Sequence, residues 1–115
     1  MPKRLEPIAK AGEAGSAALF AALGDPTRLR LVARLGRGGP MSIAGLTAGS
    51  RITRQAITKH LRVLEGAGLA RSRRRGRERL WQIERRRLQQ ARRYLDSISL
   101  QWDEALARLR KLVEE

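Results

Sequence analysis

The chain has no cysteine among its 115 residues, only one histidine and only four aromatic side chains. Without cysteine, disulfides, thiolate metal sites and cysteine nucleophiles are all excluded. The imidazole of His60 alone is too little for the three or four ligands that zinc or nickel requires, so we expect no metal site and no cofactor. The scarcity of aromatic rings argues against a protein that stacks single-stranded bases, as many RNA-binding proteins do.

Long apolar segments and catalytic groupings are missing as well. No run of roughly 18 or more apolar residues occurs, and no basic segment followed by an apolar stretch opens the chain, so we expect a cytoplasmic protein without membrane contact. Catalysis is not expected, because no activated nucleophile is recognisable and His60 has no acidic partner by spacing. The glycines at residues 36–40 are not followed by the Gly-Lys-Ser/Thr of a phosphate loop.

The formal net charge is +14, and it is concentrated in one part of the chain. Residues 51–93 carry 15 basic and 3 acidic side chains, whereas residues 1–50 carry 7 and 3, and residues 94–115 carry 3 and 5. A general preference for arginine, visible as 21 Arg against 4 Lys, would spread the charge and does not explain this concentration. A positive cluster of this kind is the electrostatic signature of a surface that binds nucleic acid.

The sequence predicts a short arm followed by a single domain. Residues 1–15 mix prolines, glycines and scattered charges, and we expect a flexible arm there with a short helical stretch at residues 5–10. Residues 16–115 are enough for one modest core. Ser16 is expected to cap a short helix that ends at Gly24.

The next elements predict a helix-turn-helix followed by a wing. Asp25 caps a helix over residues 26–35, whose arginines are expected on its outer side. Ser42 caps a short helix, and Thr53 caps another that continues to about residue 67; two helices joined by so short a turn are typical of a helix-turn-helix. Two extended segments then flank a turn at Gly76 and predict a two-stranded hairpin, the wing. Those segments are residues 69–72 and 79–83.

The second helix of this pair has the division expected of a recognition helix. At about 100° per residue, Ile57, Leu61 and Leu64 share one narrow arc and face the core. A polar arc lies roughly opposite, and its side chains are of types that contact base edges and phosphates in the major groove. Arg54 stands at the start of the helix, where a base or the backbone is within reach. The polar arc consists of Gln55, Thr58, Lys59 and Arg62.

Arginines surround the predicted wing. We interpret those around Gly76 as contacts to a phosphate backbone or an adjacent minor groove, and the alternative is a solvated hairpin in an arginine-rich chain. They are Arg71, Arg73, Arg74, Arg75, Arg77 and Arg79. A further cluster opens the last helix, where residues 85–87 either extend the phosphate track or form a solvated face.

The last 30 residues carry two interleaved seven-residue repeats of apolar side chains, without proline or glycine. The pattern predicts one long helix, and hence a mainly α fold with a small β-hairpin. Because the apolar stripe is longer than the small domain can cover, we expect it to pair two chains; the alternatives are that it folds back on its own domain or binds another protein. The stripe consists of Leu88, Ala91, Leu95, Ile98, Trp102, Ala105, Leu109 and Leu112.

Four stretches together resemble the ArsR/SmtB type of winged-helix repressors. They are Ala-Leu-Gly-Asp-Pro-Thr-Arg-Leu-Arg-Leu at residues 22–31, TRQAITKHLRVL at 53–64, EGAGL at 65–69 and GRERLWQI at 76–83. The resemblance implies a symmetric dimer that occupies operator DNA and represses transcription until an inducer, which the sequence does not identify, releases it. It also implies that residues of the DNA-reading helix are Gln55, Thr58, Lys59, His60 and Arg62, and that residues 75–79 match the wing.

The chain departs from the family in its sensor sites. The thiolate sensors of the family have a Cys-x-Cys in the helix before the turn, where this chain has Ser42, Ile43 and Ala44. Other members place histidine-containing metal sites on the last helix, which here contains no histidine. We therefore expect a sequence-specific regulator of double-stranded DNA that does not sense metal; the alternative is a non-specific architectural or RNA-binding protein.

Overall fold

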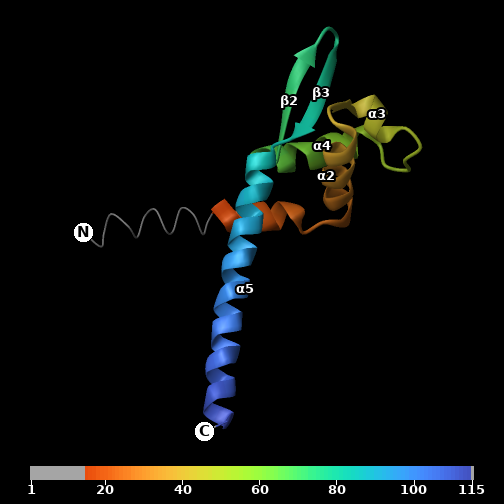
Figure 1. Ribbon diagram of the computed structural model, residues 1–115. Helices are drawn as coiled ribbons and strands as arrows, with labels where there is room; N and C mark the ends of the chain where they lie inside the picture. The colour runs from red at the N-terminus through yellow and green to blue at the C-terminus, as the bar shows by residue number, and fades with distance from the viewer. Residues whose placement is uncertain (1–14, 115) are drawn as a thin grey trace.

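The computed structural model describes residues 15–114 (Figure 1). The predicted arm lies outside the described residues except for Gly15, which is already helical, and residues 15–23 are helical throughout. The elements that follow are α2 (Pro26–Gly38), β1 (Met41–Ser42), α3 (Ile43–Thr47), α4 (Arg54–Gly66), β2 (Ala70–Arg75), β3 (Glu78–Ile83) and α5 (Arg85–Glu114). The fold is the predicted one, mainly α with a small sheet.

Three of the predicted N-caps are confirmed by their side-chain hydrogen bonds. The Asp25 carboxylate accepts from the Arg28 amide at 3.0 Å, the Ser42 hydroxyl from the Gly45 amide, and the Thr53 hydroxyl from the Ala56 amide. Each cap satisfies one backbone donor that has no partner inside its helix. The prediction for Ser16 was wrong, because that residue lies within the helical segment rather than at its start.

The sheet has one strand more than the hairpin predicted from the sequence. The two-residue strand β1 pairs antiparallel with β3, so that Met41 is opposite Trp81, and the strand order is β1-β3-β2. Two residues are too few to show the alternation by which strands are recognised. Helix α2 also extends three residues beyond its predicted end, to Gly38.

Two glycines adopt backbone conformations that favour glycine. Gly76 has a φ of 63° in the turn between β2 and β3, and Gly68 has a φ of 77° just after the C-cap of α4. At Gly68 a Cβ atom would also lie 3.3 Å from Nε of Arg87. These residues therefore fix the wing tip and the exit from the recognition helix.

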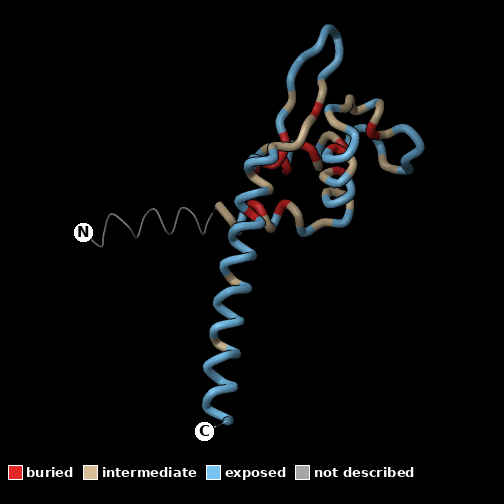
Figure 2. Tube along the Cα trace, in the orientation of Figure 1, coloured by how far each residue is buried: buried red, intermediate tan, exposed pale blue. Residues whose placement is uncertain are grey.

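The hydrophobic core lies where α2, α4 and the sheet meet (Figure 2). Trp81 of β3 is its largest member, with no exposed surface, although its indole nitrogen has no hydrogen-bond partner. The core is extended on one side by the helical segment before α2, through Leu19, and on the other by the first turns of α5, through Ala91. This packing holds the helix-turn-helix and the wing in one unit.

Helix α5 leaves that unit and projects from it as a single long rod (Figures 1 and 2). Its first turns pack against the core through Leu88 and Ala91, and the ring of Tyr94 lies 5.9 Å from that of Phe20. Beyond Tyr94 no residue of α5 is buried. Among residues 15–114, no helix is both long and apolar enough to cross a membrane.

Candidate nucleic-acid interface

Helix α4 has a buried apolar face and an exposed polar face, as its sequence predicts. Ile57, Leu61 and Leu64 are at most 1% exposed and anchor the helix to the core. The polar side chains that emerge on the exposed side are Arg54, Gln55, Lys59 and Arg62. A helix held in this way presents its polar face as a unit, which is what insertion into a major groove requires.

Two of the predicted contact residues of α4 make internal bonds. The Thr58 hydroxyl, half-buried, donates to the Arg54 carbonyl at 2.8 Å, which leaves its oxygen free only to accept. Arg62 donates to the Glu65 carboxylate at 3.1 Å, and its guanidinium lies 5.6 Å from the centre of the Trp81 ring. Arg62 is thus placed over the core tryptophan by a cation–π contact while its side chain stays mostly exposed.

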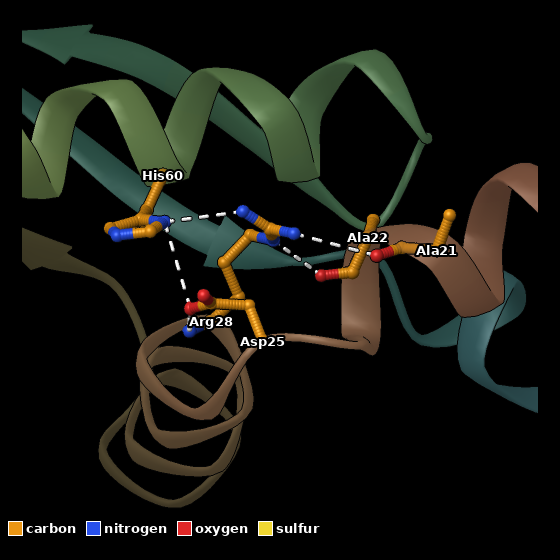
Figure 3. Close-up of polar contacts among 5 residues, drawn as sticks. All are labelled: Ala21, Ala22, Asp25, Arg28 and His60. Carbon is orange, nitrogen blue, oxygen red and sulfur yellow. Dashed lines mark hydrogen bonds and ion pairs between the residues drawn. The ribbon is translucent and has the colours of Figure 1, made fainter.

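His60 lies on the side of α4 that faces α2 (Figure 3). Its Nδ1 atom is 3.4 Å from Nη1 of Arg28 and 3.9 Å from a carboxylate oxygen of Asp25. The expectation that this histidine has no acidic partner was wrong, because Asp25 is distant in sequence and comes close only through packing of α2 on α4. Only the Nε2 edge of His60 remains for a contact with DNA.

Arg28 joins three segments of the fold at this point (Figure 3). Its Nε donates to the Ala22 carbonyl at 2.6 Å and its Nη2 lies 3.4 Å from the Ala21 carbonyl, both at the end of the helical segment before α2. The Arg28 amide that donates to Asp25, together with the Arg28 charge, holds the pKa of that carboxyl below its ordinary value. Arg28 is therefore not on the solvated side of α2, where the helical pattern had placed it.

The predicted wing arginines are all exposed. The pairing register of β2 with β3 shows which of them share a face of the hairpin. Arg74 and Arg79 are opposite each other in the pairing and lie on the face that also carries Trp81 and therefore faces α4. Arg79 donates to the Ser72 hydroxyl at 2.8 Å. Arg73 and Arg75 project from the opposite face, and Arg77 is in the tight turn itself. Arginines thus flank the hairpin on both sides.

Sequence reasoning missed two features of this surface. Arg51 is exposed in the turn that leads into α4, three residues before the helix begins. Arg87 was assigned to a phosphate track or a solvated face, but it is half-buried and donates to the carbonyls of Ala67 and Gly15 at 2.9 and 2.8 Å. The position of Arg51 two residues before the Thr53 cap is a signal that could have identified it.

The apolar stripe of α5 is divided between two environments. Leu88 and Ala91 belong to the core of their own chain, whereas Leu95, Trp102, Leu109 and Leu112 are at least 53% exposed and Ile98 and Ala105 are half-exposed. Three apolar side chains that the heptad pattern omitted, Leu100, Leu106 and Val113, are exposed as well. Within residues 15–114, no three His, Cys, Asp or Glu side chains are grouped as a metal site.

Comparison with known proteins agrees with this architecture. A family of helix-turn-helix domains matches residues 23–73. The chain is 44% identical over 69 residues to the uncharacterized HTH-type transcriptional regulator YuzN of Bacillus subtilis. The aligned region covers 55% of this chain and 75% of that protein. It superimposes on an ArsR-like transcriptional regulator from Rhodococcus sp. RHA1 with a TM-score of 0.78 and 36% identity, over 87% of this chain and 93% of the other.

A third similarity concerns the fold alone. A homodimeric winged helix-turn-helix DNA-binding domain from Mycobacterium bovis matches 87% of this chain and 89% of its own, with a TM-score of 0.63 at 20% identity. The fold and these relatives define a class, the winged helix-turn-helix regulators of transcription that bind DNA. Within that class the chain belongs to the ArsR family. It is a transcriptional regulator and not an enzyme, as its sequence predicts.

Proposed function

We propose that the chain is a homodimeric repressor that acts in the cytoplasm on a palindromic operator in double-stranded DNA. The exposed face of α4 supplies base-edge contacts through Gln55 and Thr58 and phosphate contacts through Lys59, His60 and Arg62. Arg54 contacts the DNA at the start of the helix. The arginines of the wing follow the neighbouring backbone or minor groove. The resemblance to ArsR/SmtB regulators implies that the protein represses transcription until an inducer releases it from the operator.

The observation that carries this proposal is the apolar face of α5, which continues for about five turns beyond the last contact with its own domain. Exposed apolar stripes of this length mark a protein interface. A two-fold pair built on it would place two recognition helices about one turn of DNA apart, which matches a palindrome. The Mycobacterium bovis domain is described as homodimeric, which supports the same arrangement.

Selection from a pool of random duplex DNA tests the proposal. A palindromic consensus with half-sites about one helical turn apart supports a dimeric regulator with sequence specificity. Featureless enrichment would instead indicate an architectural protein, and competition by single-stranded RNA would indicate an RNA-binding one. A gel-shift experiment on the selected site measures its affinity. A reporter gene whose promoter carries the same site then distinguishes repression from activation by the direction in which the protein changes reporter output.

A salt titration of the same complex tests the electrostatic part of the proposal. A dimer doubles each phosphate contact, and with ~6–10 phosphates neutralised the affinity should fall by about 10³- to 10⁵-fold between ~50 and ~200 mM salt. A nearly flat titration would contradict the assignment of the arginine-rich surface to DNA.

A further inference from the structure

A hollow of about 690 Å³ lies between the end of α2, the end of β3 and the first turns of α5. Its apolar lining includes Leu35, Ile83 and Leu88, which belong to the core or pack against it. A volume of this size is within the range of sites for small organic molecules. Of the residues proposed to contact DNA, Arg71 alone is in this lining, and it is paired with Glu84.

Positive charge is concentrated at its rim. Arg85 and Arg92 line the hollow and are seven residues apart on α5, which places them on one side of the helix two turns apart. Both are exposed, and neither has an ion-pair or hydrogen-bond partner among residues 15–114. The one carboxylate in the lining, Glu84, is paired with Arg71 at 3.5 Å. The hollow therefore combines an apolar floor with two guanidinium groups that lack a counter-charge.

The lining of the hollow includes no residue of the recognition helix α4. Arg71 and Gln82, which line it, are opposite each other in the β2–β3 pairing and so project from one face of the sheet. Ile83, which also lines the hollow, is on the other face together with Trp81, so the hollow wraps around the end of β3. A molecule in the hollow would therefore not compete with DNA for α4. It would instead contact α2 and α5 at once.

We propose that this hollow binds a small organic anion, a carboxylate with an apolar body, as the signal of the regulator. The carboxylate lies between Arg85 and Arg92, where charge-assisted hydrogen bonds from two guanidinium groups hold it, and the apolar body covers Leu35, Ile83 and Leu88. This inference rests on the proposed function, because it supplies the inducer that such a repressor needs.

The anion acts by fixing α5 against the end of α2. In the proposed dimer α5 sets the distance between the two recognition helices, so a ligand that prefers one orientation of α5 shifts the population toward it. We expect the bound orientation to fit the operator less well and to lower operator affinity by roughly 5- to 150-fold, the usual range of coupling between two sites.

Calorimetric titration of the full chain with octanoate and with octanamide tests the proposal, because the two probes have the same apolar body and differ in charge. At one ionic strength, octanoate should bind at least about tenfold more tightly. Arg85→Gln combined with Arg92→Gln should bring octanoate to the affinity of octanamide. The control, Arg86→Gln with Arg93→Gln, removes the same charge from exposed residues of α5 that do not line the hollow. This control variant should still bind octanoate more tightly than octanamide.

Operator binding is measured first, without octanoate or octanamide. This order tests the proposed function independently of the proposed anion site. If the chain binds its operator but binds octanoate no more tightly than octanamide, the proposed function stands and the hollow is not an anion site. Octanoate binding that survives in the Arg85/Arg92 double variant would also overturn the inference, because the anion would then bind elsewhere. Absence of operator binding would refute the proposed function whatever the probes do.

Discussion

Arg28 and His60, 32 positions apart in sequence, meet with Nη1 of the guanidinium 3.4 Å from Nδ1 of the imidazole (Figure 3). A guanidinium only donates, so this contact is a hydrogen bond when Nδ1 carries no proton. With a proton on Nδ1 the imidazole can instead donate toward Asp25, and that contact is an ion pair only when both ring nitrogens are protonated. In both states His60 ties the recognition helix to the start of α2. Arg28, through the Ala22 carbonyl, extends that connection to the preceding helical segment.

Replacing Arg28 by alanine should therefore destabilise the fold. The Ala22 carbonyl and Nδ1 of His60 would lose a partner in a partly buried setting, a loss that costs about 1–3 kcal/mol in the free energy of unfolding. Arg30→Ala, on an exposed residue two positions away, is the control and should change stability by no more than about 0.5 kcal/mol. Urea denaturation at one protein concentration measures both, and equal effects would contradict the role given to Arg28.

Replacing Asp25 by asparagine should make stability less dependent on pH in the acid range. The pKa of Asp25 is lowered by folding, so its charge stabilises the fold above its ordinary pKa of about 3.9, and that contribution is lost as the pH falls through the folded value. Asparagine keeps the cap without the charge. Asp25→Asn should thus be less stable than the parent at pH 7, and the difference should shrink toward pH 3.

Denaturation midpoints at a series of pH values measure this difference. Asp96→Asn removes a charge of the same sign from an exposed position on α5 and serves as the matched control. A gap between Asp25→Asn and the parent that stays constant from pH 7 to pH 3 would show that the carboxylate charge contributes nothing.

Gln55 and Lys59 should affect DNA binding in different ways. If Gln55 contacts a base edge, Gln55→Ala loses about 1–3 kcal/mol of discrimination at one symmetric position of the operator. Lys59→Ala should weaken binding by a similar factor on every sequence, since a phosphate contact carries no sequence information. Lys59 suits the comparison better than Arg62, whose removal also uncovers Trp81. An unchanged consensus selected by Gln55→Ala would remove Gln55 from the base contacts.

The pairing of two chains through α5 predicts that specific binding depends on Leu95 and Trp102. Truncating large interfacial side chains costs about 2–4 kcal/mol each, so Leu95→Ala with Trp102→Ala should give a monomeric or unfolded chain without operator affinity. Leu100→Ala is the control: this leucine is equally exposed but lies about 200° around the helix from Trp102. Analytical ultracentrifugation beside a gel-shift assay measures both properties. A double variant that remains a dimer of parental affinity places the interface elsewhere.

Features that depend on residues close together in the sequence were predicted correctly, and features that depend on residues far apart were not. The two faces of α4 and the caps at Asp25, Ser42 and Thr53 depend on residues within a few positions, and the structure confirms them. The chain's membership of the ArsR family also rests on contiguous motifs. Ser16 failed as a cap because Gly15 before it is already helical.

The interactions that sequence reasoning missed join residues far apart along the chain. Arg34 was expected on the outer side of α2 but donates to the carbonyls of Gly45 and Leu46, and Arg87 reaches back to Gly15. Helical periodicity assigns a long cationic side chain to solvent, although its apolar stem can cross a packed surface to a carbonyl. The strand β1 escaped prediction because two residues show no alternation and its partner strand is about forty residues away.

The enclosure of Trp81 beneath Arg62 gives the protein an optical property of its own. The chain has two tryptophans, and within a single chain Trp102 is 64% exposed whereas Trp81 has no exposed surface. The environment of the Trp102 indole therefore changes when two chains pair through α5, whereas that of Trp81 is set by its own domain. The cation 5.6 Å from the Trp81 ring imposes an electric field on that chromophore. Any phosphate that draws Arg62 outward alters the field, and the fluorescence of Trp81 then records the engagement of α4 without an attached dye.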